Sequence, residues 1–120
     1  MDIEKKLTNL TLFYDKEEYV LLTAAQTQKD LSQFNLDFIL QTDELHFDAL
    51  MDTLRPIIQD LLQNNREKIV QLFYRIDVAE NKISDALELD KFDDSVEKIC
   101  QIILLRELKK VVIRKHYSPK

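Results

Sequence analysis

Hydrophobic residues recur at intervals of three and four along most of the chain, which is the period of an amphipathic α-helix. Near the N-terminus, for example, Ile3, Leu7 and Leu10 follow this period. Pro56 is expected to open or kink a helix, because proline fits a first turn and disrupts a helix interior. Helices are predicted over residues 3–10, 15–33, 45–54, 56–64, 69–76, 78–87 and 95–115.

The last predicted helix is the most hydrophobic segment of the chain. Ile99, Ile103 and Leu108 share one stripe, and Ile102 and Leu105 widen it beyond the apolar face that a surface helix needs. Such a helix lies either at the centre of a bundle or at the interface of a homodimer. The predicted core consists of Leu61, Leu62, Ile69, Leu72, Phe73, Ile76, Ile83, Leu87, Ile99, Ile103 and Leu108.

The segment from Phe34 to Leu40 fits two patterns. Phe34, Leu36 and Phe38 alternate with polar residues as in a strand, but Leu31, Phe34 and Phe38 also fit one face of a helix. A lone strand needs a partner, and only residues 10–13 offer one. The sequence therefore favours helix or irregular structure here.

A short polar signal recurs between the apolar segments, in which an Asp or Asn is followed three residues later by a Glu. This spacing is typical of a capping box, in which both side chains satisfy free N–H groups at a helix start. The four pairs are Asp15/Glu18, Asn64/Glu67, Asp77/Glu80 and Asp94/Glu97.

Composition supports an all-helical fold. The chain contains no glycine, whereas a chain of this length would carry about eight at average usage. Hairpins and bulges depend on glycine, so corners between helices must be tight or must place Asn or Asp in the left-handed region. The sequence predicts a single all-α domain, a bundle of five to seven helices over residues 1–115, with a flexible basic tail at residues 116–120.

The missing glycine also excludes several classes of enzyme. Dinucleotide-binding, P-loop and α/β-hydrolase motifs all need glycine where the backbone approaches a phosphate or exposes a nucleophile. The sequence contains one cysteine, Cys100, no signal-peptide layout and no apolar run long enough to cross a membrane. A cytoplasmic location without membrane contact is therefore expected.

Residues 74–80 raise the question of a catalytic site. In one interpretation, Asp77 or Glu80 is a general base, Arg75 binds an anion and Tyr74 donates a hydrogen bond. In the other, which the sequence favours, Asp77 caps the next helix and Arg75 bonds the free carbonyls of the helix that has just ended. No catalytic residue is assigned.

The same residues carry a resemblance. The run Tyr74-Arg75-Ile76-Asp77-Val78, followed by Glu80, resembles a Y-R-I-D-V-x-E motif shared by small bacterial proteins of unassigned function. The resemblance covers roughly the second half of the chain. It implies a bacterial protein and brings no substrate, cofactor or activity.

Metal and cofactor sites have no clear signature. The acidic residues between Asp85 and Glu97 lack the central glycine and the alternation of a calcium-binding loop. His46 and His116 show no zinc-ligand spacing, and Cys100 lies in an apolar helix, where a buried, inert thiol is expected. The sequence predicts no metal and no cofactor.

Charge is unevenly distributed. From Arg106 onward, six Lys or Arg residues face one Glu, a balance of +5, and the preceding residues carry −10, which together give the net charge of −5. Three interpretations of the basic end stay open: a solvated helix terminus, a contact for nucleic acid, or a docking segment for an acidic protein, including a second copy. The acidic body disfavours nucleic acid.

These observations predict a non-catalytic intracellular interaction or regulatory protein that acts through helix-mediated contacts with a protein partner, with a possible homodimer through the last helix. The alternatives are a nucleic-acid-associated factor that uses the basic tail, and an enzyme with a dispersed site near Arg75, Asp77 and Glu80. The candidate interaction residues are Tyr74, Arg75, Asp77, Glu80, Lys109, Lys110, Arg114 and Lys115.

Overall fold

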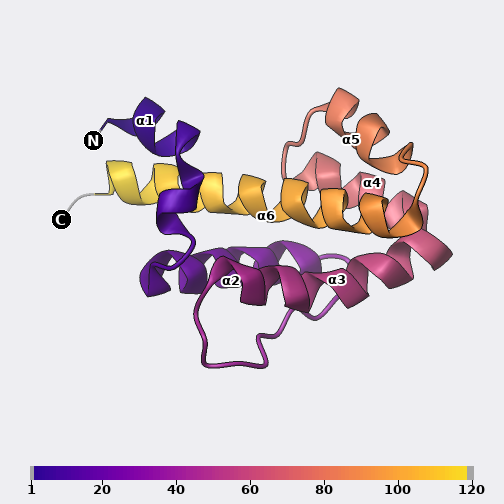
Figure 1. Cartoon of the computed structure of the whole chain (residues 1–120), viewed down its shortest axis with the longest axis horizontal. Helices are drawn as coiled ribbons and strands as arrows, with labels where there is room; N and C mark the ends of the chain where they lie inside the picture. The colour runs from indigo at the N-terminus through magenta and orange to yellow at the C-terminus, as the bar shows by residue number, and fades with distance from the viewer. Residues whose placement is uncertain (1, 119–120) are drawn as a thin grey trace.

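The structure is a computed structural model, and it describes residues 2–118. Within these residues the chain forms six α-helices and one short 3-10 helix, with no strand (Figure 1). The predicted all-α bundle of five to seven helices is therefore confirmed. The elements are α1 (Ile3–Thr8), η1 (Leu10–Phe13), α2 (Glu17–Ser32), α3 (Phe47–Asn64), α4 (Arg66–Arg75), α5 (Glu80–Leu87) and α6 (Phe92–Tyr117).

Helix α6 is the centre of the bundle, as its wide apolar surface predicts. Helices α2 and α3 pack along one side of it, and α1 and α5 lie on the opposite side (Figure 1). Ile99, Ile103 and Leu104 are fully buried in this arrangement. The surplus apolar surface that suggested a homodimer is thus covered largely by the other helices of the same chain.

The predicted core is largely confirmed. Ten of its eleven residues are buried, and Leu87 is partly buried against them. The first half of the chain adds buried residues that the prediction omitted, including Leu31, Phe47, Leu50 and Leu54. These side chains bring α2 and α3 onto α6.

Of the two effects expected of Pro56, opening a new helix is ruled out by helix α3. The helix runs unbroken from Phe47 to Asn64, with Pro56 inside it. Proline has no N–H, so one intrahelical hydrogen bond is missing at this point. Seven buried residues on one face of α3 hold the helix against the core, and packing of that kind outweighs a local breaker.

The connection between α2 and α3 is irregular. Residues 33–35 turn, and residues 36–46 cross the surface without regular structure. Phe38 nevertheless reaches the core, with only 3 % of its surface exposed. At the other end of the chain, α6 continues through His116 and Tyr117, which the sequence placed in the tail. Residues 119 and 120 of that tail lie outside the described residues.

The corner after α4 shows how the chain turns without glycine. Asp77 has φ of 62°, in the left-handed region. The Val78 N–H donates to the Phe73 carbonyl at 3.0 Å, and the Asp77 N–H donates to the Tyr74 carbonyl at 3.2 Å. This is the Schellman pattern, in which glycine usually occupies the left-handed position. Asn35, with φ of 60°, ends α2 in the same manner.

None of the four Asp or Asn residues that were predicted as helix caps occupies the N-cap position of the following helix. Asp77 belongs to the end of α4, while Ala79 precedes α5 without a side-chain cap. The cap of α4 is Asn65, which accepts from the Lys68 N–H, in place of the neighbouring Asn64. The pairs Asp15/Glu18 and Asp94/Glu97 are also wrong as caps. Lys16 precedes α2 and Lys91 precedes α6, and neither makes a side-chain cap.

The left-handed conformation of Asp77 predicts a stabilising substitution. Asp77→Gly should raise the free energy of unfolding by about 0.5–1 kcal/mol, because glycine adopts this region without steric cost. Asp77→Ala should lower it, since alanine tolerates the region less well than aspartate. Urea unfolding ranks the stabilities of the Gly variant, the wild type and the Ala variant. An Ala variant as stable as the Gly variant would contradict the conformational argument.

Candidate functional site

The eight residues singled out from the sequence do not form one site. Tyr74 and Glu80 are exposed and joined by a hydrogen bond from Tyr74 Oη to Glu80 Oε1 at 3.0 Å. This bond raises the pKa of Tyr74. Arg75 instead contacts Asp30 of α2, with Nε 3.2 Å from Oδ1. Arg75, Asp77 and Glu80 therefore do not converge as the dispersed enzyme site requires.

Arg75 also differs from its predicted structural role. It was expected to bond the free carbonyls at the end of α4. Arg106 of α6 does so instead, because its Nε donates to the Ile76 carbonyl at 2.8 Å. Within the described chain the Asp77 side chain makes no hydrogen bond, so its contribution to the corner is its backbone conformation.

The basic end of α6 lies against α2. Lys110 contacts Asp30, with Nζ 3.3 Å from Oδ2. Arg114 Nη2 donates to Gln26 Oε1 at 2.6 Å, and Lys115 pairs with Glu18. Three of the four basic candidates thus have partners on α2 of the same chain, two of them acidic, which bears on the interpretation of this end as a docking segment for an acidic protein.

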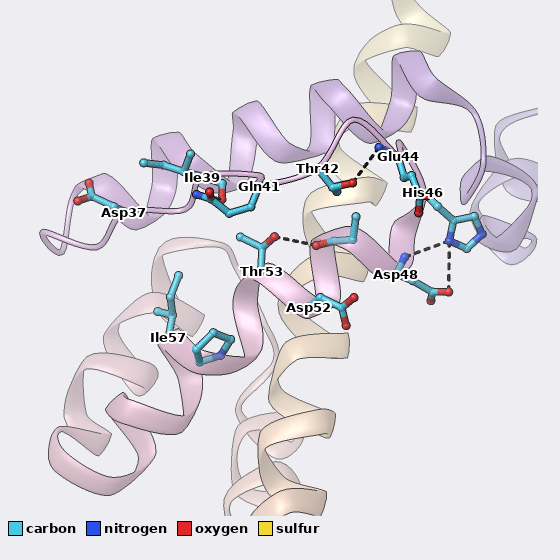
Figure 2. A pocket seen from close by; sticks show the side chains of 12 residues that line it. Asp37, Ile39, Gln41, Thr42, Glu44, His46, Asp48, Asp52, Thr53 and Ile57 are labelled. Atoms are coloured by element: carbon cyan, nitrogen blue, oxygen red, sulfur yellow. Dashed lines mark hydrogen bonds and ion pairs between the residues drawn. The ribbon is translucent and has the colours of Figure 1, made fainter.

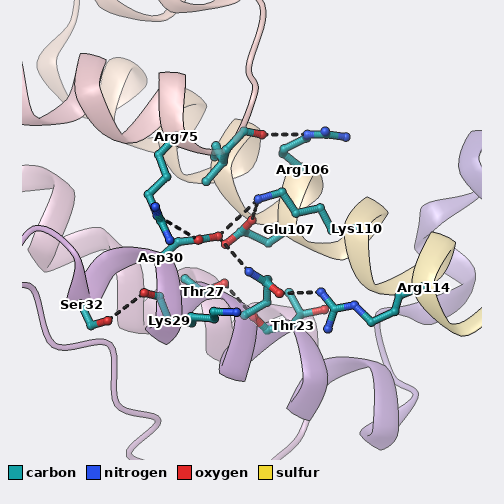
Figure 3. A network of polar contacts seen from close by, with 12 residues as sticks. Thr23, Thr27, Lys29, Asp30, Ser32, Arg75, Arg106, Glu107, Lys110 and Arg114 are labelled. Carbon is teal, nitrogen blue, oxygen red and sulfur yellow. Dashed lines mark hydrogen bonds and ion pairs between the residues drawn. The ribbon is translucent and has the colours of Figure 1, made fainter.

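A buried polar cluster joins α2, α4 and α6 (Figure 3). Asp30 is 4 % exposed and Glu107 is fully buried. Asp30 accepts from Arg75 through Oδ1 and from Lys110 and Gln26 through Oδ2. The Glu107 carboxyl has Lys110 Nζ at 3.0 Å from Oε1 and faces the Asp30 carboxylate.

The two carboxyl groups have opposite pKa shifts. The pKa of Glu107 is raised to about 8, first by burial and then by the hydrogen bond and negative charge of Asp30, which together outweigh the lowering by Lys110. Burial also works to raise the pKa of Asp30, but hydrogen bonds from Glu107, Gln26 and Lys110 outweigh it, and that pKa is lowered. The pair therefore holds one proton, on Glu107, near neutral pH.

Sequence reasoning missed both Asp30 and Glu107, although a signal was present. Glu107 stands four residues from both Ile103 and Val111, in the apolar stripe of α6. Asp30 lies on the buried face of α2 beside Leu31. A carboxyl group on an apolar face is expected to have a partner, and that rule identifies both residues as candidates.

A groove crosses α6 on the side away from α2, between α1–η1 and α5. It encloses about 730 Å³, and half-buried Ile102 and Leu105 line it together with Leu7, Leu10 and Val78. Four cations and two carboxylates also line this groove, which we call the α1–α5 groove: Lys82, Lys98, Arg106, Lys109, Asp77 and Asp85. Among the sequence candidates, only Asp77 and Lys109 reach it.

A second hollow lies between the irregular connection and α3 (Figure 2). Its charged lining residues are all acidic, namely Asp37, Glu44, Asp48 and Asp52. His46 also lines it and serves as the cap of α3, because its Nδ1 accepts from the Asp48 N–H at 3.1 Å. This histidine therefore has a structural role.

Other reactive groups offer no site. The Cys100 thiol is buried, and burial raises its pKa to about 12, so it is not a nucleophile near neutral pH. Among residues 2–118, no three His, Cys, Asp or Glu side chains gather as the ligands of a metal ion would. In the same part of the chain, each helix is too short or too polar to cross a membrane.

Comparison with known proteins gives no relative: no family model, no curated protein and no solved structure matches this chain. The resemblance through the Y-R-I-D-V-x-E motif therefore stays a prediction.

The buried cluster makes a prediction about stability. Asp30→Asn should lower the free energy of unfolding by about 2–4 kcal/mol, because the nearly buried Asp30 carboxylate is the charge that Arg75 and Lys110 both contact, and half-buried Lys110 is left beside a neutral amide. Glu18→Gln, which breaks the exposed pair with Lys115, should leave the unfolding midpoint close to that of the wild type. Urea unfolding compares the two variants, and equal effects would mean that the cluster is no stronger than a surface pair.

Proposed function

We propose that this chain is a non-catalytic cytoplasmic interaction protein whose α1–α5 groove binds an acidic, amphipathic helix of a partner protein. The reducing cytoplasm suits a chain whose single cysteine is buried and unpaired. The observation that carries the proposal is the combination, in one groove, of an apolar floor and a surplus of cations.

The apolar floor favours a hydrophobic ligand. Helix α6 is covered by other elements over most of its circumference, yet Ile102 and Leu105 stay partly exposed in the groove. Leu7 and Leu10 of the α1–η1 side, with Val78 on the other, extend this apolar surface. A partner helix that places apolar residues at intervals of three and four would cover it, as in other helix-in-groove complexes.

The charges favour an acidic ligand. Four cations against two carboxylates give the lining a balance of +2, in a chain whose net charge is −5. Lys98 and Lys109 are separated by about three turns of α6, or about 16 Å, a distance that matches a short helical segment. Local positive potential of this kind attracts acidic segments and rejects basic ones.

The alternative functions have less support. For nucleic acid, the basic tail would have to be free, but Lys110, Arg114 and Lys115 are paired with α2. For an enzyme, Arg75, Asp77 and Glu80 would have to converge, but Arg75 bonds Asp30, Glu80 bonds Tyr74, and the Asp77 side chain has no hydrogen bond within residues 2–118. The main reason to expect a homodimer was the surplus apolar surface of α6, and that helix is largely buried within one chain.

Selection of peptides tests the proposal without a known partner. A library of random peptides on phage, about sixteen residues long to match several helical turns, is selected against the wild-type chain and counter-selected against Lys82→Glu/Lys98→Glu. We expect enriched peptides that are acidic and carry apolar residues at helical spacing. Synthetic copies should bind the double variant about tenfold or more weakly, measured by fluorescence anisotropy.

Two further variants separate charge from the apolar floor. Lys91→Glu reverses one exposed cation outside the groove, as each half of the double variant does inside it, and it should leave peptide affinity nearly unchanged. Ile102→Ser should weaken binding while leaving the salt dependence unaltered. A selection that yields only basic peptides, or peptides indifferent to Lys82 and Lys98, would refute the proposed ligand.

A further inference from the structure

We propose that Asp30, Glu107, Lys110 and Arg75 form a pH-operated clasp, which fixes α2 to α4 and α6 at acidic pH and loosens as the pH rises to mildly alkaline values. The clasp is a second property of the molecule and does not depend on the proposed ligand of the groove. It follows from the position of the cluster, from the chemistry of its two carboxyl groups and from the composition of α2.

The clasp gathers charged groups from three helices. Helix α2 supplies Asp30, α4 supplies Arg75, and α6 supplies Glu107 and Lys110 (Figure 3). Gln26 of α2 adds a neutral contact, with its Nε2 3.1 Å from Asp30 Oδ2. Each contact of Asp30 with Arg75 or Lys110 therefore bridges two helices, so the cluster holds the end of α2 in place.

Helix α2 depends on these contacts more than α3 does. Its buried residues are Val20, Thr23, Thr27, Asp30 and Leu31, of which only two are apolar. The buried Thr23 hydroxyl has no hydrogen-bond partner among the described residues. By contrast, all seven buried residues of α3 are apolar. An element with few apolar contacts is the one expected to open locally.

Glu107 is the group that makes the clasp sensitive to pH. Its carboxyl is fully buried, and neither oxygen accepts a well-formed hydrogen bond from a described residue. A protonated Glu107 can donate to the Asp30 carboxylate, whereas an ionised Glu107 places a second negative charge beside it. Lys110 Nζ, shared between the two carboxyl groups, compensates only part of that charge.

The direction of the effect follows from linkage. When α2 opens, the pKa of Glu107 returns from about 8 toward its ordinary 4.5. Between these values the closed form binds more protons than the open form, so rising pH favours opening, by about tenfold per pH unit. Above about 8 both forms are ionised and the effect levels off. Asp30, with its lowered pKa, weakens the clasp only at strongly acidic pH.

Hydrogen exchange of the full-length protein tests the clasp. Amide protection in α2 is compared with that in α3, after correction for the intrinsic pH dependence of exchange. In the wild type, the ratio of α2 to α3 protection should fall by about tenfold per pH unit between about pH 5.5 and 7.5. Glu107→Gln keeps the shape of the side chain but cannot ionise, so its ratio should not change with pH.

Two controls complete the test. Glu44→Gln removes an exposed carboxylate and should behave as the wild type does. If Glu107→Gln does not fold, the ¹³C carboxyl shift of Glu107 in the wild type titrates the group directly, with an expected midpoint above about 6.5. A lower midpoint, a flat wild-type ratio, or the same slope in Glu107→Gln would overturn the clasp.

Discussion

The structure depends on the burial of one helix on nearly all sides. A helix that is apolar over most of its circumference cannot be covered by a single neighbour, so the other elements must surround it. Helices α2 and α3 take one side of α6, and α1 with α5 take the other. Helices α1 and α5 and the 3-10 helix η1 are short, and α1 has no fully buried residue. Such short elements are held in place by the apolar surface of α6 that α2 and α3 do not cover.

The absence of glycine is the second constraint, and the chain meets it with Asn35 and Asp77. Both are residue types that tolerate the left-handed region, and both end a helix in a Schellman pattern. The choice of aspartate at residue 77 has a consequence for the surface. It places a carboxylate at the edge of the α1–α5 groove, where glycine would have left the lining more positive.

The sequence predicted the helices and the core because those depend on local spacing. The stripe Ile69, Leu72, Phe73 and Ile76 is apolar at helical intervals, and all four residues are buried. At α4 the predicted cap failed because two adjacent polar residues, Asn64 and Asn65, compete for one position. At α2, α5 and α6 it failed because the residue before the helix makes no side-chain cap. The buried cluster joins residues such as Asp30 and Lys110, 80 positions apart, and only the packing of α2 on α6 brings them together.

The two sites on α6 are connected through the end of α4. Arg75, the last residue of that helix, is held by Asp30 in the clasp. The Ile76 carbonyl that follows is held by Arg106, which also lines the groove. The next residues, Asp77 and Val78, form part of the groove wall. This part of the groove wall is therefore held by two contacts, that of Arg75 with Asp30 of α2 and that of the Ile76 carbonyl with Arg106 of α6. The shape of the groove thus depends in part on the ion pair between Arg75 and Asp30, which also fixes α2.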